Sequence, residues 1–219
     1  MDIGLLIFDF DGVVADSEAL ACGVAAAYAT ELGFPMDADE GIARFMGKRS
    51  GQVRAIVEEH ISRTVPDFET ELLRRTLAAF AADLEPVAGV ADFLRRHADI
   101  PRCIASSSSH ARLRASLDRL GFTGLFEGRI FSADDVARGK PFPDLFLHAA
   151  AAMGVDRHRA LVIEDSPAGV AAGKAASMTT IGLLAGSHQR AGSAQALREA
   201  GADHVVESFA QLSALIAAG

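Results

Sequence analysis

The sequence predicts an α/β fold, a Rossmann-like parallel sheet with helices on both faces, plus an inserted all-helical domain. Three observations predict it. An apolar run, Leu5–Phe8, stands alone near the start, and residues 16–86 show only helical periodicity. From residue 87 onward, short apolar runs alternate with helix-like segments, as in strand–helix–strand units. We therefore expect residues 1–15 and 87–219 to form the α/β core and residues 16–86 to form the helical insertion.

The run Leu5–Phe8 is long enough for a strand buried on both faces and too short for a helix. Asp9, Asp11 and Gly12 follow it directly. Ligands bind outside the carboxyl ends of parallel strands, so these two acids are candidates for metal-assisted phosphoryl transfer. Two close carboxylates repel each other unless a cation or a shared proton offsets the repulsion. The alternative is a plain turn, because Asp and Gly are turn residues.

The insertion begins with an alanine-rich segment, residues 19–32, which predicts a helix that ends at Gly33. Three more helices are expected between about Asp37 and Phe80, and Pro86 marks the return of the chain to the core. We expect the later strands at residues 102–105, 128–131, 160–164, 178–183 and 204–206. We expect the helices between and after them at residues 89–97, 110–120, 143–153, 168–176, 193–200 and 209–217.

Three of the later connections also carry polar residues suited to phosphate chemistry. Ser106 begins a run of serines before a helix, where a hydroxyl and free backbone N–H groups can bind a phosphate. Lys140 lies in a proline-stiffened loop and can act as a point charge. Glu164 and Asp165 follow another apolar run and supply the oxygen ligands that Mg²⁺ prefers. Helix capping by Ser and Asp and a solvated loop lysine are the alternatives.

The composition excludes several classes of protein. A net charge of -8 and a pI of about 5.3 argue against a nucleic-acid surface, which needs a basic patch. Two cysteines, Cys22 and Cys103, are too few for a disulfide framework or a thiolate metal site. The N-terminal apolar run is short, lacks a basic lead and is interrupted by acids, so we expect no signal peptide and a cytoplasmic location. No apolar run has membrane-spanning length.

Four stretches, DFDGVVADSE, IASSS, GKPFPD and VIEDSPAG, together resemble the haloacid dehalogenase superfamily. The resemblance is to the branch with a helical cap after the first strand, which holds beta-phosphoglucomutase and sugar-phosphate phosphatases. It implies that Asp9 is the nucleophile that becomes an aspartyl-phosphate and that Asp11 is the general acid–base. It also implies that Ser106 and Lys140 bind the transferring phosphoryl group.

The same resemblance implies a Mg²⁺ site and a phosphate cradle. Asp9, Asp165 and the backbone carbonyl of Asp11 would ligate Mg²⁺, and Glu164 would support the site. The backbone N–H groups of the cradle would come from Phe10, Asp11 and Ser107. The implied partner is a small phosphorylated metabolite, with no nucleic acid and no membrane, and we expect a monomer.

The activity that these residues favour is Mg²⁺-dependent hydrolysis of a phosphomonoester, a sugar or sugar-acid phosphate. Dehalogenases of the superfamily lack the second Asp, so Asp11 argues against that activity. The alternative is a sugar phosphomutase, which carries a His shortly after its two-Asp motif, whereas residues 18–22 contain none. A non-catalytic phosphometabolite-binding protein is a further alternative, which would be favoured by the loss of a charged motif residue, and none is lost.

Substrate choice should depend on the cap. We expect the basic residues of this segment to contact the substrate, with a solvated helix surface as the alternative: Arg44, Lys48, Arg49 and Arg75. A cluster of cations suggests a ligand with a second anionic group, such as a carboxylate.

Overall fold

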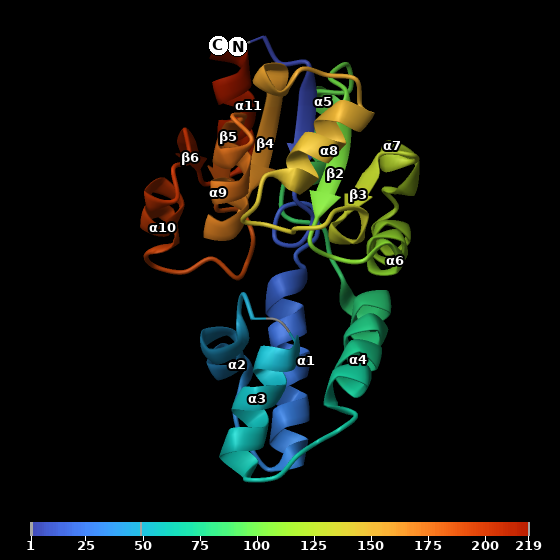
Figure 1. Ribbon diagram of the computed structural model, residues 1–219, viewed down its shortest axis with the longest axis vertical. Helices are drawn as coiled ribbons and strands as arrows, with labels where there is room; N and C mark the ends of the chain where they lie inside the picture. The colour runs from blue at the N-terminus through green and yellow to red at the C-terminus, as the bar shows by residue number, and fades with distance from the viewer. Residues whose placement is uncertain (1, 49, 219) are drawn as a thin grey trace. The chain divides into compact units, whose positions relative to one another are not determined.

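The computed structural model describes residues 2–48 and 50–218, and Figure 1 shows its elements. Arg49, one of the basic residues expected to contact substrate, lies outside the described residues. The described chain divides into two compact units, Met1–Asp16 with Glu85–Gly219, and Ser17–Leu84. The first contains the sheet, and the second is helical and is called the helical unit below.

A six-stranded sheet, counted over the described residues, runs in the order β3-β2-β1-β4-β5-β6. All of its neighbouring strands pair in parallel. The strands are β1 Leu5–Phe8, β2 Arg102–Ser106, β3 Ile130–Ser132, β4 Ala160–Glu164, β5 Thr179–Leu183 and β6 His204–Val206. The chain builds one side of the sheet from β1 to β3 and then returns to β4 beside β1. This reversal puts the topological switch point, where ligands bind in such sheets, between β1 and β4.

Helices cover both faces of the sheet, which confirms the predicted fold class (Figure 1). The helices of this unit are α5 Val90–Arg96, α6 His110–Leu120, α7 Thr123–Phe126, α8 Asp144–Ala152, α9 Pro167–Ala175, α10 Ser193–Glu199 and α11 Phe209–Ala218. The short helix α7 and the 3₁₀ turns Ala133–Asp135 and Arg157–Arg159 were not expected, because segments of three or four residues carry no periodicity.

Alternation along β1 assigns its side chains to two cores. Leu5 and Ile7 pack with apolar residues of α8 and α9 on one face. On the other face, the ring of Phe8 lies edge-on to Phe93 of α5 and Phe126 of α7, with centroids 6.0 and 6.2 Å apart. A strand buried on both faces must be apolar throughout, which is why β1 is a continuous hydrophobic run.

The helical unit has a hydrophobic core of its own. It contains α1 Ser17–Leu32, α2 Ala38–Phe45, α3 Ser50–Ile61 and α4 Phe68–Asp83. Tyr28 and Phe68 stack with ring centroids 5.0 Å apart inside it. Asp37 and Glu40 form a reciprocal capping box that starts α2. No helix in the described part of the chain is long and apolar enough to cross a membrane.

Candidate active site

The connections at the carboxyl edge of the sheet bring acidic and basic side chains together. Asp9 follows β1, and Glu164 and Asp165 lie at the end of β4, so these acids flank the switch point. Lys140 comes from the connection between β3 and α8. Ser106 is the last residue of β2, the other neighbour of β1. The candidate site is therefore assembled from four separate segments of the chain.

Lys140 ties two of these segments together. Its Nζ lies 2.6 Å from Oδ1 of Asp9 and 2.6 Å from Oε1 of Glu164. The lysine side chain is only 5% exposed, so a solvated loop lysine is ruled out. Burial alone would lower the pKa of Lys140, but the two carboxylates outweigh it and raise that pKa. The lysine is thus a permanent cation at the site.

The pKa of the Asp9 carboxyl is raised even though this lysine lies beside it. Burial raises the pKa of its carboxyl most strongly, Lys140 lowers it, and the negative charges of Glu164 and Asp165 raise it further. The net effect is a pKa well above the usual range. The largest cause is burial, which disfavours the charged carboxylate, and the excess negative charge of Glu164 and Asp165 adds to it.

A divalent cation fits this excess charge. Asp9, Glu164 and Asp165 are all buried and offer carboxylate oxygens within 4.8 Å of one another. Hard oxygen donors of this kind suit Mg²⁺, which is usually held by one or two carboxylates together with water and substrate phosphate. The donor set and its charge therefore fit the expected metal.

Glu164 is held in place by its own strand end. Its Oε2 accepts hydrogen bonds from the backbone N–H of Asp165 and from both the N–H and the hydroxyl of Ser166. With Oε1 on Lys140, both oxygens are engaged. Ser166 also caps α9 by accepting from the N–H of Gly169, so part of the expected capping is real. Glu164 is suited to supporting a metal site more than to ligating the ion.

Asp11 has two partners that the sequence did not point to. The hydroxyl of Ser108 donates to its Oδ2 at 2.6 Å, and the guanidinium of Arg112 donates to its Oδ1 at 2.7 Å. Ser108 is in turn fixed by Ser132, whose hydroxyl donates to the Ser108 carbonyl. Arg112 lies in a helix six residues after Ser106, and no spacing pattern in the sequence pointed to it. The run of serines could have suggested Ser108.

The serines at the end of β2 and directly after it have different environments and contacts. Ser106 is buried, and its hydroxyl oxygen accepts from the backbone N–H of Ser108. Ser107 is exposed, and Ser109 is the N-cap of α6. Phe10, another residue of the expected cradle, is buried, and its carbonyl accepts three backbone N–H groups that shape the turn after β1. The capping alternative thus holds for Ser109 and not for Ser106.

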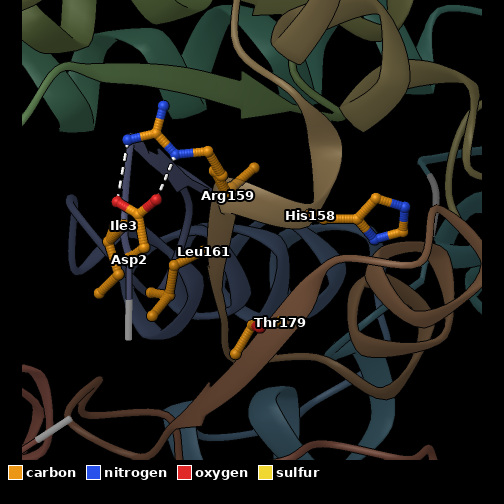
Figure 2. Close-up of a pocket in the computed structure, with 7 residues that line it drawn as sticks. Asp2, Ile3, His158, Arg159, Leu161 and Thr179 are labelled. Carbon is orange, nitrogen blue, oxygen red and sulfur yellow. Dashed lines mark hydrogen bonds and ion pairs between the residues drawn. The ribbon is translucent and has the colours of Figure 1, made fainter.

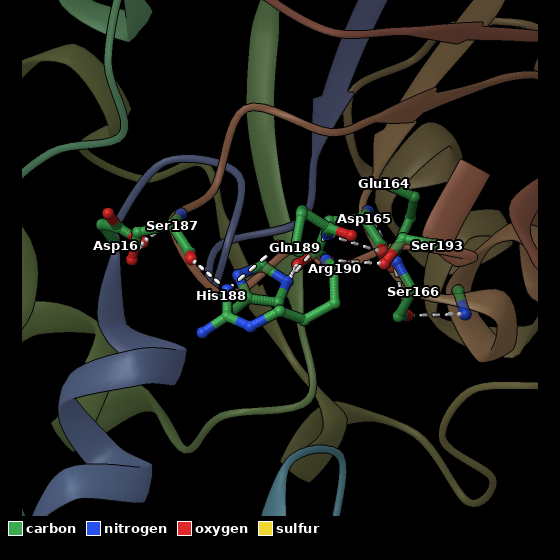
Figure 3. Close-up of polar contacts among 10 residues, drawn as sticks. Asp16, Glu164, Asp165, Ser166, Ser187, His188, Gln189, Arg190 and Ser193 are labelled. Atoms are coloured by element: carbon green, nitrogen blue, oxygen red, sulfur yellow. Dashed lines mark hydrogen bonds and ion pairs between the residues drawn. The ribbon is translucent and has the colours of Figure 1, made fainter. Parts of the chain in front are cut away.

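The loop after β5 adds His188, a residue that the sequence analysis did not single out. His188 lies with its Nε2 3.0 Å from Oδ2 of Asp165, and Figure 3 shows this loop beside the end of β4. The histidines have no metal-ligand spacing in the sequence, so His188 could not be singled out.

The basic residues of the helical unit have different environments. Arg75 forms ion pairs with Glu31 and Glu71 and lies over the ring of Tyr28. Its guanidinium therefore already has partners inside the helical unit. Arg44 is exposed and lies over the ring of Phe34, 5.4 Å from its centroid. Lys48 is exposed. A substrate contact from these residues stays a prediction.

A small cavity lies at the other edge of the sheet. It has a volume of about 150 Å³ and is lined near the starts of β1, β4 and β5, where Arg159 pairs with Asp2 (Figure 2). None of the expected site residues lines it.

Comparisons with known proteins point to a family of hydrolases. Residues 3–177 match the family model of haloacid dehalogenase-like hydrolases. The chain is 30% identical to the 6-phosphogluconate phosphatase of Escherichia coli (strain K12) over 190 residues, 86% of each chain. It is also 30% identical to the beta-phosphoglucomutase of Bacillus subtilis over 192 residues, 81% of this chain and 82% of that one.

A solved structure has the same fold. A haloacid dehalogenase family hydrolase from Deinococcus radiodurans R1, with bound phosphate and sodium, is 37% identical and superposes with a TM-score of 0.85. The match covers 99% of this chain and 96% of that chain.

Proposed function

Because the chain belongs to the haloacid dehalogenase-like hydrolases, we propose that it is a Mg²⁺-dependent phosphatase of small phosphomonoesters that works through an aspartyl-phosphate. The observation that carries the proposal is the cluster of Asp9, Lys140, Glu164 and Asp165 around one buried point. Its relatives named as phosphatases of gluconate and sugar phosphates favour a sugar or sugar-acid phosphate as substrate.

The first step assigned to the site is attack by Asp9. Its carboxylate forms a bond to phosphorus while the bond from phosphorus to the substrate oxygen breaks, and Asp11 gives that oxygen its proton. Lys140, already on Asp9, would hold the phosphoryl oxygens against the negative charge of the nucleophile. Ser106 accepts from Ser108 N–H, so its own hydroxyl proton can be donated to phosphate.

The second step returns the enzyme to its starting state. Asp11, now a carboxylate, takes a proton from a water molecule as the water attacks phosphorus, and the bond between Asp9 and phosphorus breaks. The backbone N–H groups of Phe10, Asp11 and Ser107 are proposed to hold the phosphoryl oxygens in both steps.

Asp9 and Asp165, with the backbone carbonyl of Asp11, would hold Mg²⁺, and Glu164 would keep Lys140 and the start of α9 in place. When bound, the ion supplies positive charge that offsets the repulsion between the carboxylates and the phosphate dianion. Burial and the neighbouring charges of Glu164 and Asp165 raise the pKa of Asp9, and a bound cation would offset both effects.

The direct test is a screen of sugar and sugar-acid phosphates with Mg²⁺, measured as release of inorganic phosphate. Asp9→Asn should abolish release, while the matched control Asp2→Asn, an exposed residue at the other edge of the sheet, should keep it. Circular dichroism verifies that both variants are folded. Turnover by Asp9→Asn at the wild-type rate would refute the assignment.

The similarity to a beta-phosphoglucomutase makes a sugar phosphomutase the second candidate. The sequence from Glu18 to Cys22 offers no histidine for it. Incubation with β-glucose 1-phosphate distinguishes the two, because a mutase yields glucose 6-phosphate and the proposed enzyme yields glucose and phosphate.

We also propose that the exposed cations Arg44 and Lys48 favour substrates with a second anionic group. The 6-phosphogluconate phosphatase relative acts on such a compound. Turnover of 6-phosphogluconate should exceed that of neutral sugar phosphates, and Arg44→Gln with Lys48→Gln should reduce the preference. Equal rates for both substrate types in the wild-type enzyme would contradict this. Arg75 is left out because Glu31 and Glu71 already neutralise it.

A further inference from the structure

The loop after β5 contacts Asp165 at two points. His188 is only 6% exposed, and its Nε2 lies 3.0 Å from Oδ2 of the Asp165 carboxylate. The side-chain amide of the next residue, Gln189, donates to the backbone carbonyl of Asp165 at 3.2 Å. The amide nitrogen of Gln189 also lies 2.8 Å from Nε2 of His188, so this ring nitrogen lies between the Gln189 amide and the Asp165 carboxylate. A carboxylate only accepts hydrogen bonds, so an imidazole that carries its proton on Nε2 would donate to Asp165.

Two glycines make the slot for this imidazole. A Cβ on Gly12, in the turn after β1, would lie 2.7 Å from Cε1 of His188 and would overlap Oδ2 of Asp165. A Cβ on Gly186 would also lie 2.7 Å from Cε1 of the same ring and 2.8 Å from the carbonyl oxygen of Gly12. Real Cβ atoms do not approach other atoms that closely, so the ring position depends on both residues being glycine.

The loop that carries His188 is itself anchored. Ser187 donates both its backbone N–H and its hydroxyl to Oδ1 of Asp16, at 3.0 and 2.9 Å (Figure 3). Arg190 donates to the carbonyls of Ser187 and Gln189, at 2.8 and 3.0 Å. The backbone on both sides of His188 is therefore fixed within the sheet-containing unit.

We propose that His188 is a positioning residue for the metal ligand Asp165, a role that rests on the proposed function. By holding Oδ2 it fixes the rotation of the carboxylate, and Gln189 fixes the backbone from which that carboxylate projects. A ligand held in its binding orientation loses less conformational freedom when the ion arrives. Partners that orient metal ligands typically change metal affinity by roughly 10- to 100-fold when removed.

Substitutions of His188 that differ in reach test the proposal. In His188→Gln the amide can reach Asp165 and restore an N–H donor, whereas the side chain in His188→Asn is one methylene shorter. The matched control is His158→Asn, an exposed histidine at the other edge of the sheet. Binding of Mn²⁺ to the full chain, followed by electron paramagnetic resonance of the free ion, gives a readout independent of turnover.

We expect His188→Asn to raise the Kd for Mn²⁺ by roughly 10-fold or more, and His188→Gln and His158→Asn to stay close to wild type. In the phosphatase assay, His188→Asn should require more Mg²⁺ for half-maximal rate and retain most of its kcat at saturation. A folded His188→Asn that binds Mn²⁺ like the wild type overturns the proposal and leaves the proposed function standing. A wild-type chain that binds no Mn²⁺ overturns both.

Discussion

The carboxylate of Asp11, the proposed general acid–base, is fixed by hydrogen bonds that a carboxylate in a solvated loop would lack. Both of its carboxylate oxygens have a partner, Ser108 on one side and Arg112 on the other. The Arg112 and Asp11 side chains are 24% and 13% exposed, so solvent screens the pair only partly. These contacts keep the carboxylate at the end of the sheet in one orientation, and they place a fixed positive charge beside the group that we propose as the general acid–base.

We expect Arg112→Met to lower kcat/KM by roughly 10-fold, because positioned acid–base catalysis is typically worth 10²–10⁴ and only its orientation is lost. The loss should vanish in an Asp11→Asn background, where no carboxylate remains to orient. Steady-state kinetics of the two single variants and the double variant measure this coupling. Equal fold-losses in both backgrounds would show that Arg112 acts independently of Asp11.

At the scale of elements, the start of α9 approaches the end of β4 very closely. Gly169 lies in the first turn of α9, and a Cβ there would overlap both carboxylate oxygens of Glu164. The absence of a side chain thus lets the helix N-terminus close over an acid that is fully buried. Gly169 is needed for this approach, whereas a helix interior normally disfavours glycine.

Gly169→Ala should displace Glu164 and with it Lys140. We expect a loss of about 1–3 kcal/mol in the free energy of unfolding, typical of overpacking, measured by urea denaturation. The matched control is Gly124→Ala in α7, where a Cβ would meet no described atom within 4 Å. If both variants were equally stable, the close approach would be shown to relax without cost.

At the scale of the molecule, the two units have separate hydrophobic cores, and each contains one cysteine. Cys22 belongs to the cluster of the helical unit and Cys103 to the cluster beneath α8 and α9. Burial raises the pKa of the Cys22 thiol to about 12, with a smaller contribution from Glu18, and burial also raises the pKa of Cys103. Neither thiol is a thiolate at neutral pH in the folded protein, so both report on unfolding.

We expect iodoacetamide at pH 8 to leave both thiols of the native protein unmodified. On unfolding, each thiol pKa returns to about 8.5 and labelling becomes fast. With increasing urea, Cys22 should be labelled before Cys103, because the smaller unit buries less of its surface. Mass spectrometry of the two peptides measures the order. Simultaneous labelling would show that the units unfold as one.

The sequence by itself determined the parallel sheet, because a strand buried on both faces must be a continuous apolar run such as Leu5–Phe8. It also marked Asp9, Asp11, Lys140 and Asp165 as candidates, since the connections at the carboxyl ends of parallel strands collect at one edge of the sheet. Only the tertiary structure decided which groups contact them. Ser108, Arg112 and His188 reach their carboxylates through packing between segments far apart in the chain, and no local pattern encodes such distances.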